Sequence, residues 1–267
     1  MREQLLFLGT AGGPVAFSKR MGLGSGILIK FDDAVFFLDP GTGSVSQAIV
    51  NGLNLRELSA VFVSHRHLNH AGDLNAAISS MTLGGLDVKG VLVAGKDVLG
   101  KDSSCGVVDP FFKNAVERII LLEDKKRFGI GSIDIVAEKL IHSDECFGFK
   151  FYSDNLCFGY VPDTEYFSGL IDKFKECDVL VLCIKNPSGV SSKYSLNIDD
   201  VVNITKGVNP SLLILTHFGS KLFEVNPVMA AREVRTKAGC ETVVAKAGLV
   251  VEPRTYSMGS IQKRLKF

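Results

Sequence analysis

The chain has 267 residues, with 30 lysine and arginine residues against 29 aspartate and glutamate residues, so its formal net charge is +1. This balance argues against a dedicated DNA- or RNA-binding protein, which carries a marked basic excess. Hydrophobic residues make up 46% of the chain and charged residues 22%, which excludes the disordered, collagen-like and low-complexity classes. No apolar run reaches the roughly 18 residues of a transmembrane helix, so we expect no membrane association.

Apolar runs rich in β-branched and aromatic residues alternate with glycine-bearing turns, a pattern typical of strands. We predict strands at Leu5–Leu8, Gly26–Phe31, Ala34–Leu38, Val61–Val63, Val91–Ala94, Ile119–Leu122, Phe147–Phe151, Val179–Ile184, Leu212–Leu215 and Thr242–Val251. Helical periodicity and capping residues predict helices at Ser44–Leu53, Asp73–Leu83, Thr164–Phe174, Asn197–Lys206 and Asn226–Ala238. No linker and no internal repeat divides the chain. We therefore expect one domain over residues 1–267, in which helices cover packed sheets.

The cysteines indicate the redox compartment. They are Cys105, Cys146, Cys157, Cys177, Cys183 and Cys240. No two of them have the C-x-x-C spacing, and several lie inside apolar runs. We therefore expect reduced, mostly buried thiols in a cytoplasmic protein, with no disulfide and no cysteine ligand to a metal.

Histidine gives the strongest functional signal. The chain has five histidines, and three of them, His65, His67 and His70, lie within six consecutive residues. A buried strand leads directly into His65, and the two-residue repeat of a strand places His65 and His67 on one side. The turn that follows returns His70 toward the same cavity. A single histidine would favour a structural role, but a cluster of this kind favours a divalent metal such as zinc.

The segment from His65 to His70 resembles the H-x-H-x-D-H signature of the metallo-β-lactamase superfamily. Further motifs of that superfamily occur in the expected order along the chain. The glycine-rich loop at residues 9–14 and Asp39-Pro-Gly41 precede this segment, and His142 in His-Ser-Asp-Glu-Cys-Phe-Gly, Asp163 in Val-Pro-Asp-Thr and His217 in Leu-Thr-His-Phe-Gly follow it. Taken singly, each motif also has a structural interpretation, and the ordered series favours the functional one. The series is most similar to the ribonuclease Z-like and phosphodiesterase-like branch, which includes uncharacterised archaeal-type metal-dependent hydrolases.

This resemblance implies an α/β fold, the four-layer αββα sandwich, with the site at one edge between the sheets. It implies that one metal is bound by His65, His67 and His142, and a second by Asn69, His70 and His217, with Asp163 bridging the two. Zinc is the expected cofactor, as one or two ions, and manganese and iron are the alternatives. Asp39 is expected to hold a ligand histidine in the correct tautomer.

Two positions depart from the superfamily pattern. Residue 69 is asparagine where the signature has aspartate, and an amide cannot act as a general base near neutral pH. Asn69 and Asp163 remain the candidate catalytic residues, and we expect a weaker second metal site, slower hydrolysis, or both. Members that process transfer RNA have an additional histidine near the segment 193–198, and this chain has none there. Ribonuclease Z activity is therefore not expected.

The resulting hypothesis is a metal-dependent hydrolase in which a metal-activated water attacks a phosphodiester or another ester bond. Phosphodiesters are favoured because backbone N–H groups of the loop Gly9–Gly13 are expected to meet anionic oxygens. The substrate would be a small-molecule or oligonucleotide ester; nucleic acid is not the favoured partner, and a homodimer is compatible with the sequence. Two alternatives stay open: a degenerate member that binds metal or ligand with little or no turnover, which Asn69 supports, and a nuclease.

Replacing Asn69 by aspartate tests the importance of this departure. We expect Asn69→Asp to bind a second metal more tightly and to hydrolyse a phosphodiester faster, because it adds a negative ligand and a proton acceptor. General-base catalysis is typically worth about 10²–10⁴-fold in rate. Metal titration and phosphodiester rates of both forms check this. If the aspartate form gains neither affinity nor rate, the binding-only alternative is preferred.

Overall fold

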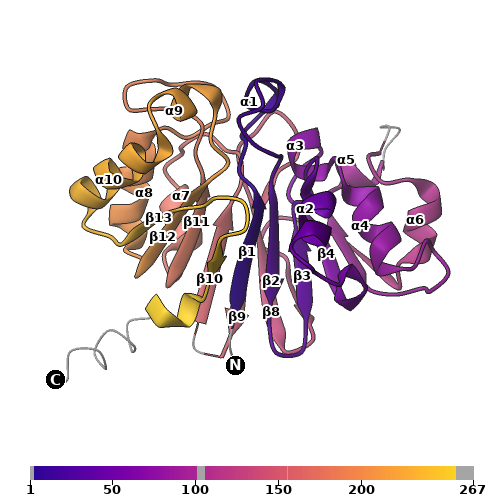
Figure 1. Ribbon diagram of the computed structural model, residues 1–267. Helices are drawn as coiled ribbons and strands as arrows, with labels where there is room; N and C mark the ends of the chain where they lie inside the picture. Colours follow the sequence, from indigo (N-terminus) through magenta and orange to yellow (C-terminus); the bar gives the residue numbers. More distant parts are fainter. Residues whose placement is uncertain (1–2, 101–105, 155, 257–267) are drawn as a thin grey trace.

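The computed structural model describes residues 3–100, 106–154 and 156–256, which form two seven-stranded sheets packed face to face (Figure 1). The first sheet has the order β14-β1-β2-β3-β4-β5-β6, with β1 (Gln4–Gly9), β2 (Gly26–Lys30), β3 (Val35–Leu38), β4 (Ala60–Val63), β5 (Val91–Ala94), β6 (Arg118–Leu121) and β14 (Val250–Val251). The second has the order β13-β12-β11-β10-β9-β8-β7, with β7 (Arg127–Ile130), β8 (Ile133–Lys139), β9 (Phe147–Ser153), β10 (Leu156–Val161), β11 (Val179–Cys183), β12 (Leu212–Thr216) and β13 (Thr242–Val244).

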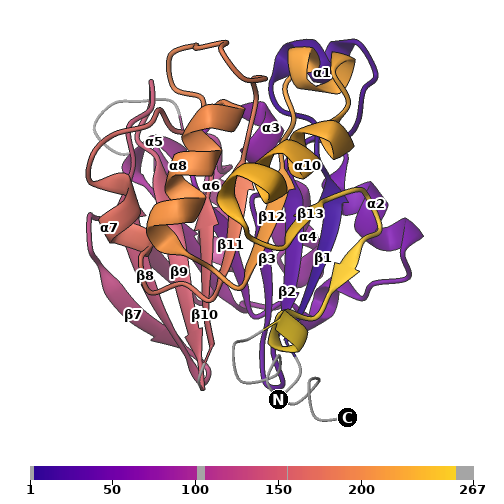
Figure 2. The ribbon, with the colours of Figure 1, turned by 90° about the vertical axis from the view of Figure 1, so that its left-hand side faces the viewer.

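Helices cover both outer faces of the sheet pair, as Figures 1 and 2 show. The first sheet is covered by α2 (Ser44–Val50), η1 (Leu55–Glu57), α4 (Leu74–Met81), α5 (Lys96–Leu99) and α6 (Pro110–Ala115). The second is covered by α7 (Leu170–Phe174), α8 (Ile198–Val208) and α10 (Pro227–Ala238). The predicted four-layer αββα sandwich is confirmed. Among the described residues, no helix has the length and apolar character that crossing a membrane requires.

The apolar core has three layers, one between the sheets and one under each set of helices. Aromatic rings fill the central layer: Phe62 lies 5.1 Å from Phe36, 5.5 Å from Phe149 and 5.4 Å from Phe151, measured between ring centroids. These rings come from both sheets, so their contacts fix the position of one sheet against the other.

The functional motifs gather at one edge because of strand direction. Strands β3 to β6 run parallel to one another, and so do β10 to β13. Carboxyl ends of parallel strands meet at one edge of a sheet, where α/β proteins place their ligand sites. The short helices α1 (Pro14–Ser18), α3 (Leu68–Ala71) and α9 (Ser220–Glu224) lie together at this end of the molecule in Figure 1.

Two predicted elements were wrong in extent. The helix predicted over Thr164–Phe174 begins only at Leu170, because the N–H of Glu165 and the hydroxyl of Thr164 donate to the carbonyl of Ile141 instead. The strand predicted over Thr242–Val251 is divided by a turn into β13 and β14, which belong to different sheets. The strands β7, β8 and β10 were not predicted, nor were several short helices, namely α1, α3, α5, α9, η1 and η2 (Pro253–Tyr256).

The central aromatic layer should dominate the stability of the fold. We expect Phe62→Ala to lower the free energy of unfolding by about 3–5 kcal/mol, because it opens a cavity between the sheets. Phe111→Ala is the matched control: Phe111 is 58% exposed on α6, and its loss should cost less than about 1 kcal/mol. Urea unfolding of the three proteins measures both values. Equal costs at the two positions would contradict the assignment of the central layer as the main core.

Candidate metal centre

The candidate ligands lie after the ends of strands or, for His70, on a short helix, all at the same edge of the sandwich. His65 and His67 lie between β4 and α3, and His70 lies on α3 itself. His142 follows β8, Asp163 follows β10 and His217 follows β12. The chain thus delivers these side chains from both sheets to one location.

The structure brings these side chains together in two groups. His65, His67, His142 and Asp163 form one group, and His70, Asp163 and His217 form the other, and within each group the ligand atoms lie within 4.8 Å of one another. Asp163 belongs to both groups, which is the place that the sequence motifs assigned to the bridging carboxylate. The arrangement contains nitrogen and oxygen donors only, a set that suits zinc.

The inward-facing ring nitrogens converge closely. Nε2 of His65 lies 3.2 Å from Nδ1 of His67, and Nε2 of His70 lies 2.9 Å from Nε2 of His217. Oδ1 of Asp163 lies 3.6 Å from Nε2 of His217. Lone pairs gathered at these distances are what a divalent cation requires, so the residues fit a metal.

Asp39 orients the ring of His70 through the ring nitrogen that faces away from the cavity. Its buried carboxylate accepts hydrogen bonds from the backbone N–H of Ser64 at 2.6 Å, from the Ser64 hydroxyl at 2.7 Å and from the Tyr160 hydroxyl at 2.7 Å. Nδ1 of His70 lies 2.7 Å from the same carboxylate. With Nδ1 bound to this carboxylate, Nε2 is the nitrogen that faces the cavity and that would bind a metal.

Similar outer contacts orient two more rings. The Ser64 hydroxyl, whose proton goes to Asp39, accepts from Nδ1 of His65 at 3.0 Å. Nε2 of His67 lies 2.9 Å from Oδ2 of Asp144. In both rings the other nitrogen therefore presents its lone pair to the cavity. Outer partners of this kind are a regular feature of histidine metal sites.

Burial keeps most of the rings neutral. Desolvation is the main cause that lowers the pKa of His142 and of His217 to about 4, and it also holds the pKa of His65 well below its ordinary value. Neutral imidazole is the form that binds a metal, so these rings need no deprotonation near pH 7.

His70 differs from the other rings. Burial opposes its protonation, but the carboxylates of Asp39 and Asp163 outweigh burial and raise the pKa of His70 to about 9. In contrast, Asp163 stays ionised: burial opposes ionisation, but the Lys185 ammonium and His217 hold the pKa of Asp163 well below its ordinary value. A metal that binds Nε2 of His70 must therefore displace a proton at neutral pH.

Asn69 lies beside the second group. Its side-chain Nδ2 is 2.8 Å from Nε2 of His217, so the amide occupies the place of the signature aspartate. Its backbone packs tightly against the Asp39-Pro-Gly41 turn, since a Cβ on Gly41 would lie 2.1 Å from the Asn69 carbonyl oxygen. Only glycine fits at position 41, which explains that part of the motif.

Two residues of the centre have left-handed backbone conformations. Asp39 has φ 49° and His217 has φ 59°, values that are uncommon for residues other than glycine. Such conformations cluster at functional sites, where the surrounding packing enforces them. Gly12 packs directly against the backbone of His217. A Cβ on Gly12 would lie 2.2 Å from the His217 carbonyl oxygen.

Two N–H groups of the glycine-rich loop are engaged within the protein. We predicted that its N–H groups would meet anionic oxygens, but the N–H of Gly12 donates to the carbonyl of Phe218 at 2.7 Å and that of Ala11 to the carbonyl of Leu23 at 2.8 Å. These two N–H groups are thus used within the protein. The loop packs β1 against the His217 segment.

Sequence reasoning missed two residues of the centre. The Nζ of Lys185 donates to Oδ2 of Asp163, and the ring of Tyr194 lies 5.5 Å from that of His142. Lys185 immediately follows the predicted strand Val179–Ile184, and this position was its only sequence signal. The contacts of both residues depend on chain segments that are distant in the sequence.

Two acids that lie close to the ligands in the sequence, Asp73 and Glu145, are engaged elsewhere. Asp73 precedes α4, and its carboxylate accepts from the N–H of Val45 at 2.9 Å, so it supports the start of α2. Glu145 accepts from the N–H of Lys96 at 2.8 Å and supports the start of α5.

The five described cysteines are all free thiols, and Cys105 lies outside the described residues. Cys146 comes closest to the centre, with its sulfur 3.7 Å from Nδ1 of His65. Burial raises the pKa of Cys146 well above its ordinary value, so it stays a protonated thiol. Neither ligand group contains a cysteine among the residues that the structure describes.

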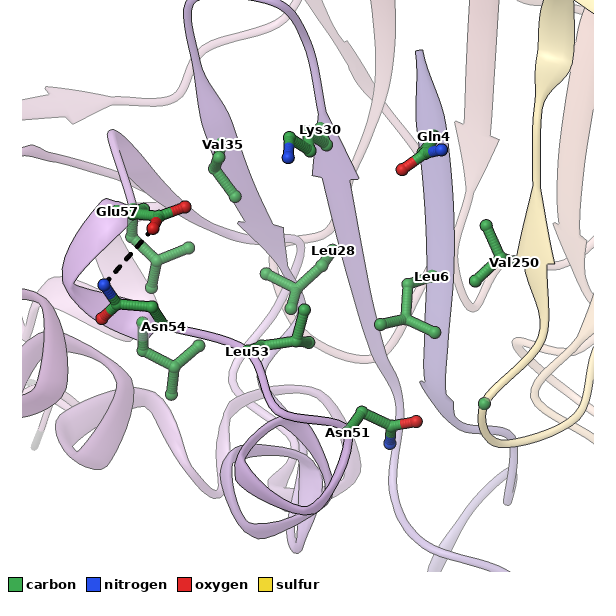
Figure 3. Close-up of a pocket in the computed structure, with 13 residues that line it drawn as sticks. Gln4, Leu6, Leu28, Lys30, Val35, Asn51, Leu53, Asn54, Glu57 and Val250 are labelled. Carbon is green, nitrogen blue, oxygen red and sulfur yellow. Dashed lines mark hydrogen bonds between the residues drawn. The ribbon is translucent and has the colours of Figure 1, made fainter. Parts of the chain in front are cut away.

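Of two concavities in the surface, one lies apart from the metal centre and the other includes Lys185 in its lining. The pocket in Figure 3, of about 270 Å³, has an apolar floor that includes Leu6 and Leu28 and contains no residue of the centre. A groove of about 300 Å³ runs between the glycine-rich loop and the segments after β11 and β12, and Lys185 is in its lining. The charged side chains in this lining are Lys185 and Lys221, so the groove is complementary to an anion.

Comparison with known proteins identifies the family. Residues 35–218 match the family described as the beta-lactamase superfamily domain. The chain belongs to the beta-lactamase superfamily. Members of this superfamily are mostly metal-dependent hydrolases.

Three similar proteins illustrate the range of this superfamily. An uncharacterized protein of Methanocaldococcus jannaschii is 27% identical over 260 residues, which cover 94% of this chain and 96% of that protein. A ribonuclease Z of Lactobacillus acidophilus is 28% identical over 185 residues, or 66% of this chain and 54% of the enzyme. The metallo-beta-lactamase fold protein YhfI of Bacillus subtilis superposes with a TM-score of 0.79 at 21% identity, covering 94% of this chain and all of YhfI.

Removing one ring of the first group tests whether this member of the beta-lactamase superfamily binds a metal there. We expect His142→Ala to weaken zinc binding by more than the roughly 10–100-fold that loss of an outer partner costs. Glu145→Gln is the control, since Glu145 is three residues away and contacts α5 rather than the centre. Competition with a chromophoric zinc chelator measures both affinities. Unchanged zinc affinity in His142→Ala would contradict the ligand assignment.

Proposed function

We propose that this protein is a metal-dependent hydrolase of phosphodiester bonds, whose metal is held by His65, His67, His142 and Asp163. The observation that carries the proposal is the convergence of inward-facing nitrogens around Asp163, with their outer nitrogens held by Asp39, Ser64 and Asp144. Zinc is the preferred ion, because the donors are imidazole and carboxylate and all but one of the rings are kept neutral by burial.

An anionic substrate is supported by the groove beside the centre. Lys185 and Lys221 line it, and no acidic residue does. Sequence similarity to a ribonuclease supports the same bond type, because ribonucleases cleave phosphodiesters. The transfer-RNA-processing activity itself is not proposed, since Tyr194 lies beside His142 in the segment where those members have a histidine.

The residues of the chain have distinct roles in this proposal. A bound divalent metal lowers the pKa of a water toward about 7 and polarises the substrate oxygen. Asp163, kept ionised, accepts a hydrogen bond from the attacking water and orients it. The Lys185 ammonium binds an anionic oxygen of the substrate that enters from the groove. Asn69 contributes a neutral amide beside His217 and no proton acceptor of carboxylate strength.

A binding-only function is the second candidate, and Asn69 is the observation that favours it. With an amide in place of the aspartate, the second group has Asp163 as its single carboxylate ligand. A protein of this kind would take up metal and an anionic ligand without turnover.

Turnover of a generic phosphodiester separates the two functions. We expect wild-type protein loaded with zinc, manganese or iron to hydrolyse bis(p-nitrophenyl) phosphate. Asp163→Asn should lower the rate by about 10²–10⁴-fold at saturating metal, because the neutral amide cannot take the proton of the attacking water. Glu145→Gln should keep the wild-type rate. Full metal occupancy of the wild-type protein without turnover of any phosphodiester tested would contradict the hydrolase proposal and favour binding alone.

A further inference from the structure

Lys185 brings a positive charge into the centre that the superfamily motifs do not explain. It follows β11, and its Nζ donates to Oδ2 of Asp163. The Lys185 side chain is 21% exposed, whereas that of Asp163 is 1% exposed. The ion pair is therefore sheltered on the carboxylate side and reaches the groove on the lysine side.

The carboxylate oxygen that Lys185 contacts also faces both histidine groups. Oδ2 of Asp163 lies 3.9 Å from Nε2 of His65 and 3.5 Å from Nε2 of His70. An ammonium on this oxygen is close to the place that a cation shared by Asp163 and His70 would take. The Lys185 ammonium therefore competes with a second divalent ion for the place between Asp163 and His70.

Asn69 is an independent observation that points to the same conclusion. Asparagine in place of aspartate removes one negative charge from the second group, where its amide contacts His217. An ammonium in place of a divalent cation removes one positive charge from the same group. The two changes compensate each other, which matters because an uncompensated buried charge is costly.

We propose that Lys185 takes the place of the second divalent cation, so that the centre holds one metal, at His65, His67, His142 and Asp163, and one ammonium on the side of His70. This inference rests on the proposed function for its metal and its substrate. It assigns to Lys185 the task of a second cation: to hold Asp163 in position and to bind an anionic oxygen of a phosphodiester.

The test measures zinc bound per chain, which does not depend on turnover. Wild-type protein, Lys185→Met, Asn69→Asp and the double variant are dialysed against a series of zinc buffers, and the metal is counted by plasma mass spectrometry. We expect wild-type protein to hold one zinc tightly. Lys185→Met should bind a second zinc at least about 10-fold more tightly than wild-type protein does, because it removes a positive charge a few ångströms from that ion. Asn69→Asp should be shifted in the same direction, and the double variant furthest.

Two controls separate charge from packing. Lys185→Arg keeps the positive charge and should keep the wild-type stoichiometry. Lys221→Met removes the other lysine of the groove and should also bind zinc as the wild-type protein does. Circular dichroism checks that each variant is folded. If Lys185→Met does not fold, Asn69→Asp still tests the charge balance, because it adds a negative charge to the same group and should also increase the affinity for a second zinc.

The outcomes distinguish this inference from the proposed function. Equal affinity for a second zinc in wild-type protein, Lys185→Met and Asn69→Asp overturns the role of Lys185, and so do two tightly bound zinc ions in the wild-type protein. Absence of zinc binding in the wild-type protein overturns the metal centre together with this inference. One zinc in wild-type protein and a second in Lys185→Met, with no phosphodiester turnover in either, supports the role of Lys185 and contradicts the hydrolase function.

Discussion

The buried carboxylate of Asp39 is the group on which the rest of the centre depends. Asp39 follows β3, and its carboxylate accepts hydrogen bonds from Ser64 after β4 and from Tyr160 on β10 and contacts His70 on α3. Elements of both sheets are therefore joined through one fully buried acid. A carboxylate without these partners would be costly to bury, so the hydrogen bonds that stabilise the fold also set the orientation of the ligand ring.

The charge around Asp163 decides what the centre can hold. Burial favours neutral rings, and a buried carboxylate needs a positive partner. Lys185 is such a partner within the chain, and a metal at the first group would be a second. The asparagine at position 69 fits this balance, since a further carboxylate would call for a further cation. The chemistry of the centre thus follows from compensation among a few buried groups.

The sequence predicted the parts of the centre that local pattern determines. The three closely spaced histidines after a buried strand indicated the site, although His65 and His67 lie in the bend between β4 and α3 rather than on the strand. The order of the motifs along the chain predicted the fold. The role of Lys185 was not predictable, because its contact with Asp163 depends on the pairing of β10 with β11. For the same reason the helix expected from residue 164 was too long: the competing hydrogen bonds come from Ile141, a residue distant in the sequence.

The most direct test of the metal centre is its anomalous scattering. Crystals of zinc-loaded protein, with diffraction data collected on both sides of the zinc absorption edge, locate the ion without reference to activity. The account predicts an anomalous peak about 2.0–2.1 Å from ring nitrogens of His65, His67 and His142, with Asp163 completing the ligands. A zinc-loaded crystal with no peak among these side chains, or with its peak elsewhere in the molecule, would contradict it.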